Sequence, residues 1–373
     1  MRVVLAPNAF KGSFDGVAVA RAWAEALAGR AETRLAPMSD GGDGFLAVVR
    51  YHRPRVLEVA ARVRDPLGHP VAARWGWDPE GGAAYLESAA AIGLRLVERE
   101  RRAPLMATTA GLGRLIRTAA GLGPAELVVG LGGSATVDGG LGMARALGYR
   151  FEDQAGGAIE RPADLPRLAR IARPEEPPLP DGVRVLALAD VTAPLHGPDG
   201  AARAYGPQKG ADPAAVERLA EGLERMAEAW REDLAAPVDL TRRPGAGAAG
   251  GLGAALVAFL GAELVPGSEW CAELAGLDAA LVGADGLVTG EGRFDRQSLR
   301  GKATGRALEG ARAAGVRAAV VCGVADAGAG AGDVLVVEGS AVGRGREDRL
   351  DTGDLARLVG LVLDRWEAIL PPR

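Results

Sequence analysis

Lysine is rare in this chain, and each of its lysines lies next to a glycine. Lys11, Lys209 and Lys302 are the only three among 44 lysines and arginines in a sequence of 373 residues. A compact ammonium group suits point contact with a phosphate, whereas the planar guanidinium of arginine favours bidentate contact. Three ammonium groups beside bare backbone therefore indicate a polyanionic ligand, and the alternative is chance placement in a glycine-rich chain.

The densest glycine turn, residues 132–140, follows a predicted strand at residues 127–131 and precedes a predicted helix. Backbone amides at a helix start can bind phosphate, and hydroxyl groups can add hydrogen bonds. The alternative is a tight, capped strand-to-helix turn. Because two adjacent glycine pairs exceed what a cap requires, we favour phosphate binding by Gly132, Gly133, Ser134, Ala135 and Thr136.

Two further segments carry acids beside glycines. Asp40 and Asp43 flank a glycine pair, which is typical of a turn that binds magnesium or a hydroxyl group and equally of two helix N-caps. Glu291, Arg293 and Asp295 follow an apolar strand predicted at residues 286–289, and open α/β sheets bind ligands at the carboxyl ends of strands. Arg293 could hold a carboxylate or phosphate bidentately, or it could form a solvated salt bridge.

One acid is isolated in an apolar context. Asp190 ends a strand predicted at residues 183–190, with no other charge between Val185 and Leu195. An acid at this place could act as a general base or could cap the next turn.

The elements that would position these residues begin with strand, glycine-rich turn and helix, twice over. The strands are predicted at residues 3–7 and 33–38, and the helices end near residues 28 and 49. Ser13 or Asp15 caps the first helix. This alternation is typical of an open parallel sheet.

The middle of the chain differs, and the first pattern then returns. We expect a hairpin at 56–77, strands at 83–88, 127–131 and 183–190, helices at 109–120, 213–230 and 254–260, and a proline-rich surface connection at 161–182. The last part is predicted to form strands at 286–289, 316–322 and 334–338 and helices at 302–314 and 355–369.

The predicted fold class is therefore α/β: a doubly wound, flavodoxin-like parallel-sheet domain interrupted by an inserted α/β domain with a mixed sheet. Residues 1–52 and 284–373 would form the first domain and residues 53–283 the second. We expect the active site in the cleft between them, where closure of a double crossing could exclude water.

The composition excludes several classes of protein. A net charge of −4 argues against a nucleic-acid binder, and the 55 glycines and 23 prolines have no fixed period, which excludes collagen. Two cysteines cannot build a disulfide framework, so we expect a reducing cytoplasmic setting without a signal peptide. Residues 245–262 lack charge but are mostly Gly and Ala, so we expect a loop and a buried helix, not a membrane span. The bias toward Ala, Gly, Arg and Pro is typical of GC-rich coding or of a thermophile.

Taken in order, these segments resemble the type 1 glycerate kinase family, that of the bacterial glycerate 2-kinases. The resemblance is carried by residues 6–13 (APNAFKGS), 37–44 (PMSDGGDG), 130–136 (GLGGSAT), 138–140 (DGG), 190–192 (DVT), 206–211 (GPQKGA), 247–253 (GAAGGLG), 290–298 (GEGRFDRQS) and 301–302 (GK). The family usually has Asp at Asn8, Glu at Asp43, Asn at Val137 and Ala193, and Thr at Ser298.

The resemblance implies an enzyme that uses ATP and Mg²⁺ to phosphorylate D-glycerate, with 2-phosphoglycerate favoured over 3-phosphoglycerate. We assign catalysis to Asp190, Asp295, Lys11, Lys302 and Arg293, with Asp190 as general base and Asp295 in reserve. ATP is assigned to the five loop residues 132–136 with Lys209, Gly250 and Gly251. Glycerate is assigned to Asn8, Ser13, Asp40, Gly41, Gly42, Glu291 and Gln297, and magnesium to Asp295 and Asp43.

Two other functions stay open at this point. The loop GLGGSA resembles the phosphate loop of galactose, homoserine and mevalonate kinases, although the doubly wound opening at residues 3–49 argues against that fold. A non-catalytic sensor of nucleotides or sugar acids would need no general base. The expected partners are small molecules rather than nucleic acid or membrane. The product's regiochemistry, the domain that holds ATP, the metabolic pathway and the oligomeric state, a homodimer included, are left open.

Overall fold

The computed structural model describes residues 1–299, 301–326, 329, 332–345 and 349–369. The chain forms two compact units: Met1–Arg53 with Gly267–Arg373 (unit 1), and Pro54–Pro266 (unit 2). The sequence pattern predicts the return to the first domain at residue 284. The division falls earlier because α9 (Gly267–Ala275) and α10 (Leu277–Leu281) pack on elements of unit 1.

Unit 1 is built on a five-stranded sheet in the order β13-β12-β11-β1-β2. The strands are β1 (Arg2–Pro7), β2 (Glu32–Leu35), β11 (Gly286–Phe294), β12 (Arg317–Ala325) and β13 (Leu335–Glu338), and all neighbouring pairs are parallel. Counted along the unit, this order reads 2-1-3-4-5, the flavodoxin-like arrangement. The predicted fold class of this part is therefore confirmed.

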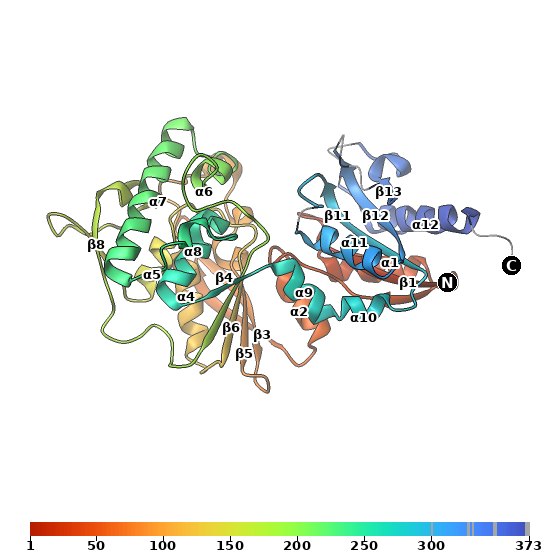
Figure 1. Cartoon of the computed structure of the whole chain (residues 1–373), viewed down its shortest axis with the longest axis horizontal. Coiled ribbons are helices and arrows are strands. Elements are labelled where there is room, and N and C mark those ends of the chain that lie inside the picture. The colour runs from red at the N-terminus through yellow and green to blue at the C-terminus, as the bar shows by residue number, and fades with distance from the viewer. Residues whose placement is uncertain (300, 327–328, 330–331, 346–348, 370–373) are drawn as a thin grey trace. The chain divides into compact units, whose positions relative to one another are not determined.

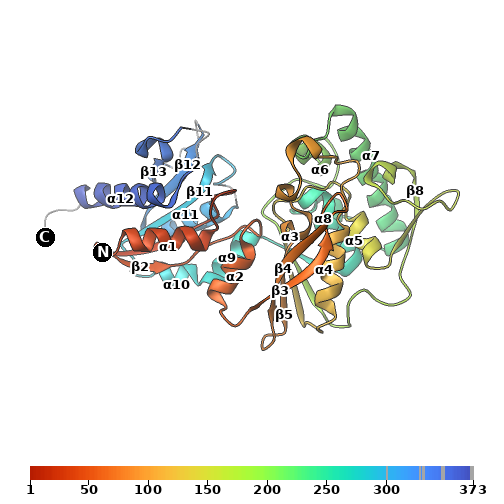
Figure 2. The same ribbon diagram turned by 180° about the vertical axis from the view of Figure 1, so that it is seen from behind.

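Helices cover both faces of this sheet, as the opposite views in Figures 1 and 2 show. They are α1 (Gly16–Ala26), α2 (Phe45–His52), α9, α10, α11 (Ala303–Ala313) and α12 (Thr352–Ile369). Trp23 of α1 and Leu355 of α12 share one core with Val288 of β11, whereas Leu308 of α11 packs with Val320 on the other side. Of the two predicted caps, Asp15 is the one that caps α1, since its Oδ1 accepts from Ala18 N at 2.8 Å.

Unit 2 is built on a mixed six-stranded sheet in the order β10-β9-β6-β5-β4-β3. The strands are β3 (Leu57–Arg64), β4 (Pro70–Asp78), β5 (Ala83–Glu87), β6 (Glu126–Gly130), β9 (Arg184–Leu188) and β10 (Glu263–Val265). The hairpin of β3 and β4 is antiparallel, as predicted, and the strands from β5 to β10 in the sheet are parallel. The mixed sheet predicted for the inserted domain is confirmed.

The helices of unit 2 bury their apolar faces on this sheet and on one another. They are α3 (Ala89–Ile92), α4 (Ala110–Ala120), α5 (Leu141–Ala146), α6 (Ala201–Tyr205), α7 (Pro213–Leu234) and α8 (Ala248–Leu260). Short 3-10 helices are η1 (Leu94–Leu96), η2 (Arg99–Arg101), η3 (Pro162–Arg167), η4 (Pro207–Lys209) and η5 (Leu240–Arg242), with η6 (Gly339–Val342) in unit 1. Asp212 caps α7 through Ala215 N at 2.8 Å, as predicted.

Three local expectations were wrong. The connection at 161–182 contains β8 (Leu168–Ala172), which pairs with β7 (Arg150–Asp153), because Leu168 and Ile171 bury their side chains in the core. Strand β9 ends at Leu188, before Asp190. Strand β11 runs on to Phe294, so Glu291 and Arg293 lie in the strand and not in a turn after it.

Pairing with a neighbour explains that extension of β11. The sheet partner β12 continues to Ala325, and Glu291 lies opposite Cys322. The close approach of β12 to β11 also requires glycine at position 290, because a Cβ on Gly290 would lie 2.0 Å from Val321 O. Within the described residues, no helix combines the length and apolar character needed to cross a bilayer.

Candidate functional site

The strand order of unit 1 marks one place where a ligand is expected. In doubly wound sheets, ligands bind at the carboxyl ends of the strands where the order reverses, here between β1 and β11. Asn8 lies just beyond β1 and its N donates to Gly290 O at 2.8 Å. Its Oδ1 accepts from Ala9 N at 2.8 Å, so this side chain, 3% exposed, already has a backbone partner.

Glu291 is a buried acid at this edge. It is 8% exposed, and its Oε1 has no hydrogen-bond partner among the described residues. Burial raises the pKa of Glu291, opposed by the hydroxyls of Thr304 and Ser298 and by the Lys302 ammonium, while Asp40 raises it further. A carboxyl group in this position is well suited to exchange a proton or to accept a bond from a ligand.

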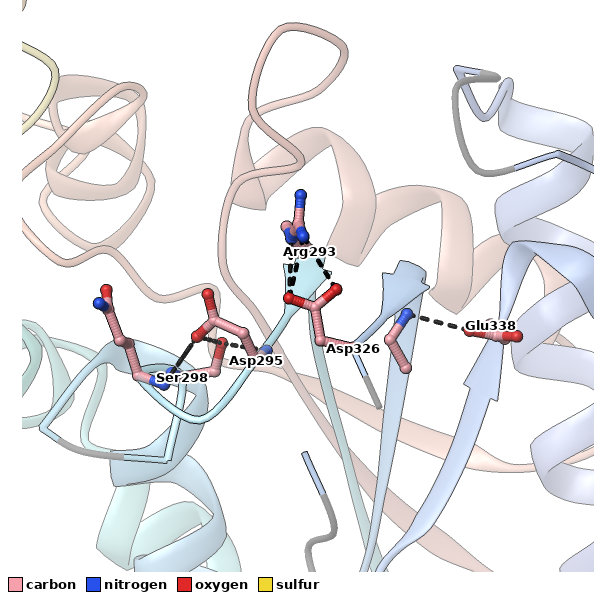
Figure 3. Close-up of polar contacts among 7 residues, drawn as sticks. Arg293, Asp295, Ser298, Asp326 and Glu338 are labelled. Atoms are coloured by element: carbon pink, nitrogen blue, oxygen red, sulfur yellow. Dashed lines mark hydrogen bonds and ion pairs between the residues drawn. The ribbon is translucent and has the colours of Figure 1, made fainter. Parts of the chain in front are cut away.

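The pKa of Asp295, four residues further along the chain, is displaced in the opposite direction from that of Glu291. Its Oδ1 accepts from Gln297 N at 2.7 Å and Ser298 N at 3.0 Å, and Asp295 N donates to Ser298 Oγ at 3.0 Å (Figure 3). Burial favours a higher pKa, but the amides of Ser298 and Gln297 and the Lys302 ammonium outweigh it, so the pKa of Asp295 is lowered. Two acids with pKa values displaced in opposite directions are typical of acid–base chemistry.

Arg293 forms the salt bridge that was the alternative reading of this motif. Its Nη2 lies 2.9 Å from each carboxylate oxygen of Asp326, and its Nε lies 3.1 Å from Oδ2 (Figure 3). The Arg293 side chain is 66% exposed and that of Asp326 31%. A substrate carboxylate would therefore share this guanidinium with Asp326, which corrects the expectation of a clamp that is ready for a ligand.

The other residues predicted in unit 1 surround the same strand ends. Asp40 Oδ1 accepts from Gly42 N at 3.0 Å, so a turn holds its carboxylate, and Lys302 is the N-cap residue of α11. A Cβ on Gly292 would lie 3.4 Å from Lys11 N, which brings the Lys11 turn beside β11. Exposed residues here are Lys11, Ser13 and Gln297, whereas Gly41 and Gly42 are buried and Asp43 is half-buried.

In unit 2, Lys209 joins the glycine turn predicted to bind phosphate. It is 4% exposed, and its Nζ donates to Ser134 Oγ at 2.9 Å and to Thr136 O at 2.8 Å. Burial lowers the pKa of Lys209 to about 7, opposed by the carboxylate of Asp138. The ammonium thus lies behind the turn and holds its backbone.

Asp138 makes the capping hydrogen bonds that were the alternative to phosphate binding by this turn. It accepts from Thr109 N and Oγ1 at 2.8 Å, and from Gly140 N and Gly142 N at 3.0 Å. Burial raises its pKa, opposed by these hydrogen bonds. The carboxyl group therefore connects the starts of α4 and α5, a role that the sequence suggested only as an alternative.

The backbone of the turn is largely held by its neighbours. Ala135 N donates to Ile92 O at 2.8 Å and Gly139 N donates to Gly250 O at 3.1 Å. The Ala135 amide is thus engaged, which corrects its assignment as a phosphate donor. Gly250 has a φ of +71°, and a Cβ there would lie 2.1 Å from Thr136 O, so only glycine fits beside the turn. Gly251, at φ +91°, follows directly.

Asp190 also belongs to unit 2, two residues beyond β9. It is half-buried, and the preceding Ala189 N donates to Val265 O at 3.0 Å. The two acids predicted as candidate bases therefore lie in different units, Asp190 in unit 2 and Asp295 in unit 1.

The part of the chain that the structure describes contains no group of three or more His, Cys, Asp or Glu residues placed to hold a metal ion. Asp295 and Asp43 therefore form no complete cage. Mg²⁺ is commonly held by one or two carboxylates together with substrate phosphates. An ionised, half-buried Asp295 fits such a partial site.

Sequence reasoning missed several participants. Asp326, Thr304 and Thr109 were not singled out, because each acquires its meaning from a partner at least 13 positions away in another segment, such as Arg293 for Asp326. Asp326 lies one residue beyond β12 in the structure, but the strand predicted at 316–322 ended four residues before it, so the signal that identified Asp190, an acid ending a predicted strand, did not apply.

Comparisons with known proteins agree over nearly the whole chain. Residues 3–338 match the glycerate kinase family. A glycerate kinase from Halalkalibacterium halodurans is 39% identical over 325 residues, which are 86% of this chain and 85% of that protein. A glycerate 2-kinase from Escherichia coli K12 is 39% identical over 312 residues, 81% of this chain and 80% of that protein. A crystal structure from Salmonella typhimurium LT2, assigned as glycerate kinase 2, has a TM-score of 0.80 at 34% identity and covers 99% of this chain and 97% of its own.

Proposed function

The chain belongs to the glycerate kinase family, and from that premise we propose that it transfers the γ-phosphoryl group of ATP to the 2-hydroxyl of D-glycerate. The enzyme is an ATP-dependent glycerate kinase, and 2-phosphoglycerate is the product that we propose. The observation that carries the proposal is the cluster of charged groups at the β1/β11 edge, where the buried Glu291 and the half-buried Asp295 both interact with the Lys302 ammonium.

Phosphoryl transfer needs positioned reactants, neutralised phosphate charge and a base near the accepting hydroxyl. We assign charge neutralisation to Lys11 and Lys302 and orientation of glycerate to the acids and amides of the same edge. These are Asn8, Ser13, Asp40, Gly41, Gly42, Glu291 and Gln297. Arg293 would take the glycerate carboxylate in exchange with Asp326.

We assign the proton of the attacking hydroxyl to Asp190, with Asp295 as the alternative acceptor. Asp295, with Asp43, would hold Mg²⁺ together with phosphate oxygens of the nucleotide. The ion, when bound, supplies positive charge to the phosphate oxygens. The low pKa of Asp295 supports this assignment, because a metal ligand must be ionised at neutral pH.

For unit 2 we propose the phosphates of ATP as ligand. The support is Lys209, which places a positive charge directly behind residues Ser134 and Thr136. Burial lowers its pKa to about 7, and a bound anion would favour the charged form. Both cysteines are buried free thiols, which agrees with the cytoplasmic location that we propose.

Phosphorus NMR of the reaction mixture tests activity and product together. The phosphorus of 2-phosphoglycerate couples to one carbon-bound proton and that of 3-phosphoglycerate to two, so the expected signal is a doublet. A triplet would overturn the proposed regiochemistry but not the activity. If ATP is not consumed when D-glycerate is supplied, while another hydroxy acid supports turnover, the substrate assignment is wrong.

A further inference from the structure

An arginine-lined cavity lies beside η4 in unit 2 and has no part in the function described above. Its volume is about 650 Å³, within the range typical of small-ligand pockets. Arg99 and Arg102 line one part, and Pro207, Gln208, Gly210 and Asp212 line another. Lys209 lies between two of these residues without lining the cavity, since its ammonium is directed to the glycine turn.

Arg102 lines this cavity with part of its side chain. Its Nη1 donates to Gln208 O at 3.0 Å, which fixes the guanidinium against η4. Its Nε is fully buried and has no hydrogen-bond partner among the described residues. A ligand in the cavity would therefore contact the part of the guanidinium group that lines it, and not the buried Nε.

The surrounding charge identifies the kind of acceptor that fits. Arg99 adds a second, exposed guanidinium to the lining. Asp212 is also present, but its Oδ1 is committed to Ala215 N as the cap of α7. The start of this 22-residue helix lies at the cavity wall, where the Asp212 carboxylate that caps it adds one negative charge against the two guanidinium groups. Two guanidinium groups and a helix start suit a multiply charged oxyanion better than a singly charged carboxylate.

We propose that this cavity is a binding site for a phosphoryl-type oxyanion, held by Arg102 and Arg99. The inference does not depend on glycerate phosphorylation, because no residue of the cavity is assigned to that reaction. The phosphoryl group could belong to the nucleotide itself or to a separate phosphorylated small molecule. Both sources offer the same chemistry to Arg102.

Calorimetric titration of the full-length protein with inorganic pyrophosphate, at an ionic strength kept constant with NaCl, tests the site. We expect Arg102→Gln to weaken pyrophosphate binding by about tenfold or more, because charge-assisted hydrogen bonds are lost. Arg99→Gln should weaken it less. Arg99 is exposed, so this variant keeps the test open if Arg102→Gln does not fold. The matched control is Arg117→Gln, an exposed arginine of α4 that lines a different cavity of the same unit.

Hydrogen exchange locates the bound anion. Pyrophosphate should slow exchange in the peptides that contain residues 99–102 and 207–212. Equal affinity in the wild type and both cavity variants, or protection confined to other segments, would overturn the proposal.

A repetition at saturating ATP separates the two sources of the phosphoryl group. Loss of pyrophosphate binding at the cavity would assign it to the phosphate chain of the nucleotide. Retained binding would assign it to a separate ligand. The kinase assay on the same variants reports on the proposed function independently.

Discussion

Both units end parallel strands in glycine-rich turns that carry charged groups, yet they treat those charges differently. In unit 2 the charges are buried and bonded: Lys209 holds the turn through Ser134 and Thr136, and Asp138 accepts from Thr109 and from glycine amides. In unit 1 the charged groups differ in burial: Glu291 is 8% exposed, whereas Lys11 is exposed and Arg293 pairs with a partly exposed Asp326.

The difference follows from the free energy of burying a charge. A buried charge is tolerated only when it is paired and hydrogen-bonded, so the turn in unit 2 has one geometry that its own contacts define. An exposed pair is worth about 0–1 kcal/mol and exchanges readily with a ligand. We infer that unit 2 presents a preformed turn, whereas unit 1 supplies groups that can change partners. The following predictions test this contrast.

The largest effect is expected at Asp190, the proposed base. Asp190→Asn should lower kcat by about 10²–10⁴-fold while glycerate binding and melting temperature are retained, because proton transfer in the transition state is lost. Steady-state kinetics and thermal unfolding measure both. The control is Asp181→Asn, an exposed acid of the same unit. A variant that keeps its rate but loses stability would show that Asp190 only caps a turn.

The next largest effects are expected from substitutions of Lys302 and Lys11 in unit 1, which should lower the rate more than the stability of the fold. Replacement of either by Met is expected to remove about 2–4 kcal/mol of transition-state stabilisation, because a charge on the transferring phosphate is no longer neutralised. The ratio of kcat/KM values gives this energy. Arg312→Met, an exposed change in α11, is the control for Lys302. Turnover near that of the wild type in both lysine variants would contradict the assignment.

Lys209 predicts a pH dependence of stability in unit 2. Its pKa is lowered from 10.5 to about 7 in the folded chain by burial. Between these values the unfolded state binds more protons than the folded state, so the free energy of unfolding should rise with pH. Below about pH 7 both states are charged and this dependence disappears. Denaturant unfolding from pH 6 to 10 should show a smaller rise in Lys209→Met, and equal slopes would mean that burial does not lower the pKa of Lys209.

A smaller effect is expected from removing Asp326, the carboxylate that pairs with Arg293 and would compete with the substrate for it. Asp326→Asn should lower the KM for glycerate by up to about fivefold with kcat unchanged, because an exposed ion pair worth 0.2–1 kcal/mol no longer competes with the substrate carboxylate. The exposed Asp333→Asn is the control in the same unit. If KM does not change in Asp326→Asn or in Arg293→Met, Arg293 does not contact the substrate.

The site expected between the domains stays a prediction. The change in radius of gyration that it implies is the smallest of the expected effects. The two candidate bases lie in different units, so joint action would require a site to which both units contribute. An ATP analogue with glycerate should then reduce the radius of gyration in solution scattering more than either ligand alone. An unchanged radius would favour Asp295, in the same unit as Lys302, as the base.

Much of the local structure was predictable from the sequence, because its causes lie within a few residues. Apolar spacing placed β1 and the β3–β4 hairpin, and Asp212 followed by Pro213 marked the start of α7. The repeated strand, glycine turn and helix predicted the doubly wound unit, which also argues against the fold of the galactose-type kinases. The ordered motifs predicted the family.

The chemistry of the individual charges required the tertiary structure. Lys209 and Ser134 are 75 positions apart, and Arg293 and Asp326 are 33 apart, so no local pattern reveals either contact. The full length of β11 depended on its pairing with β12, which carried Glu291 into the sheet and buried it. Local propensity and spacing determine the elements, whereas burial and pairing depend on which distant segments meet. These long-range contacts decide which acid has a raised pKa and which cation already has a partner.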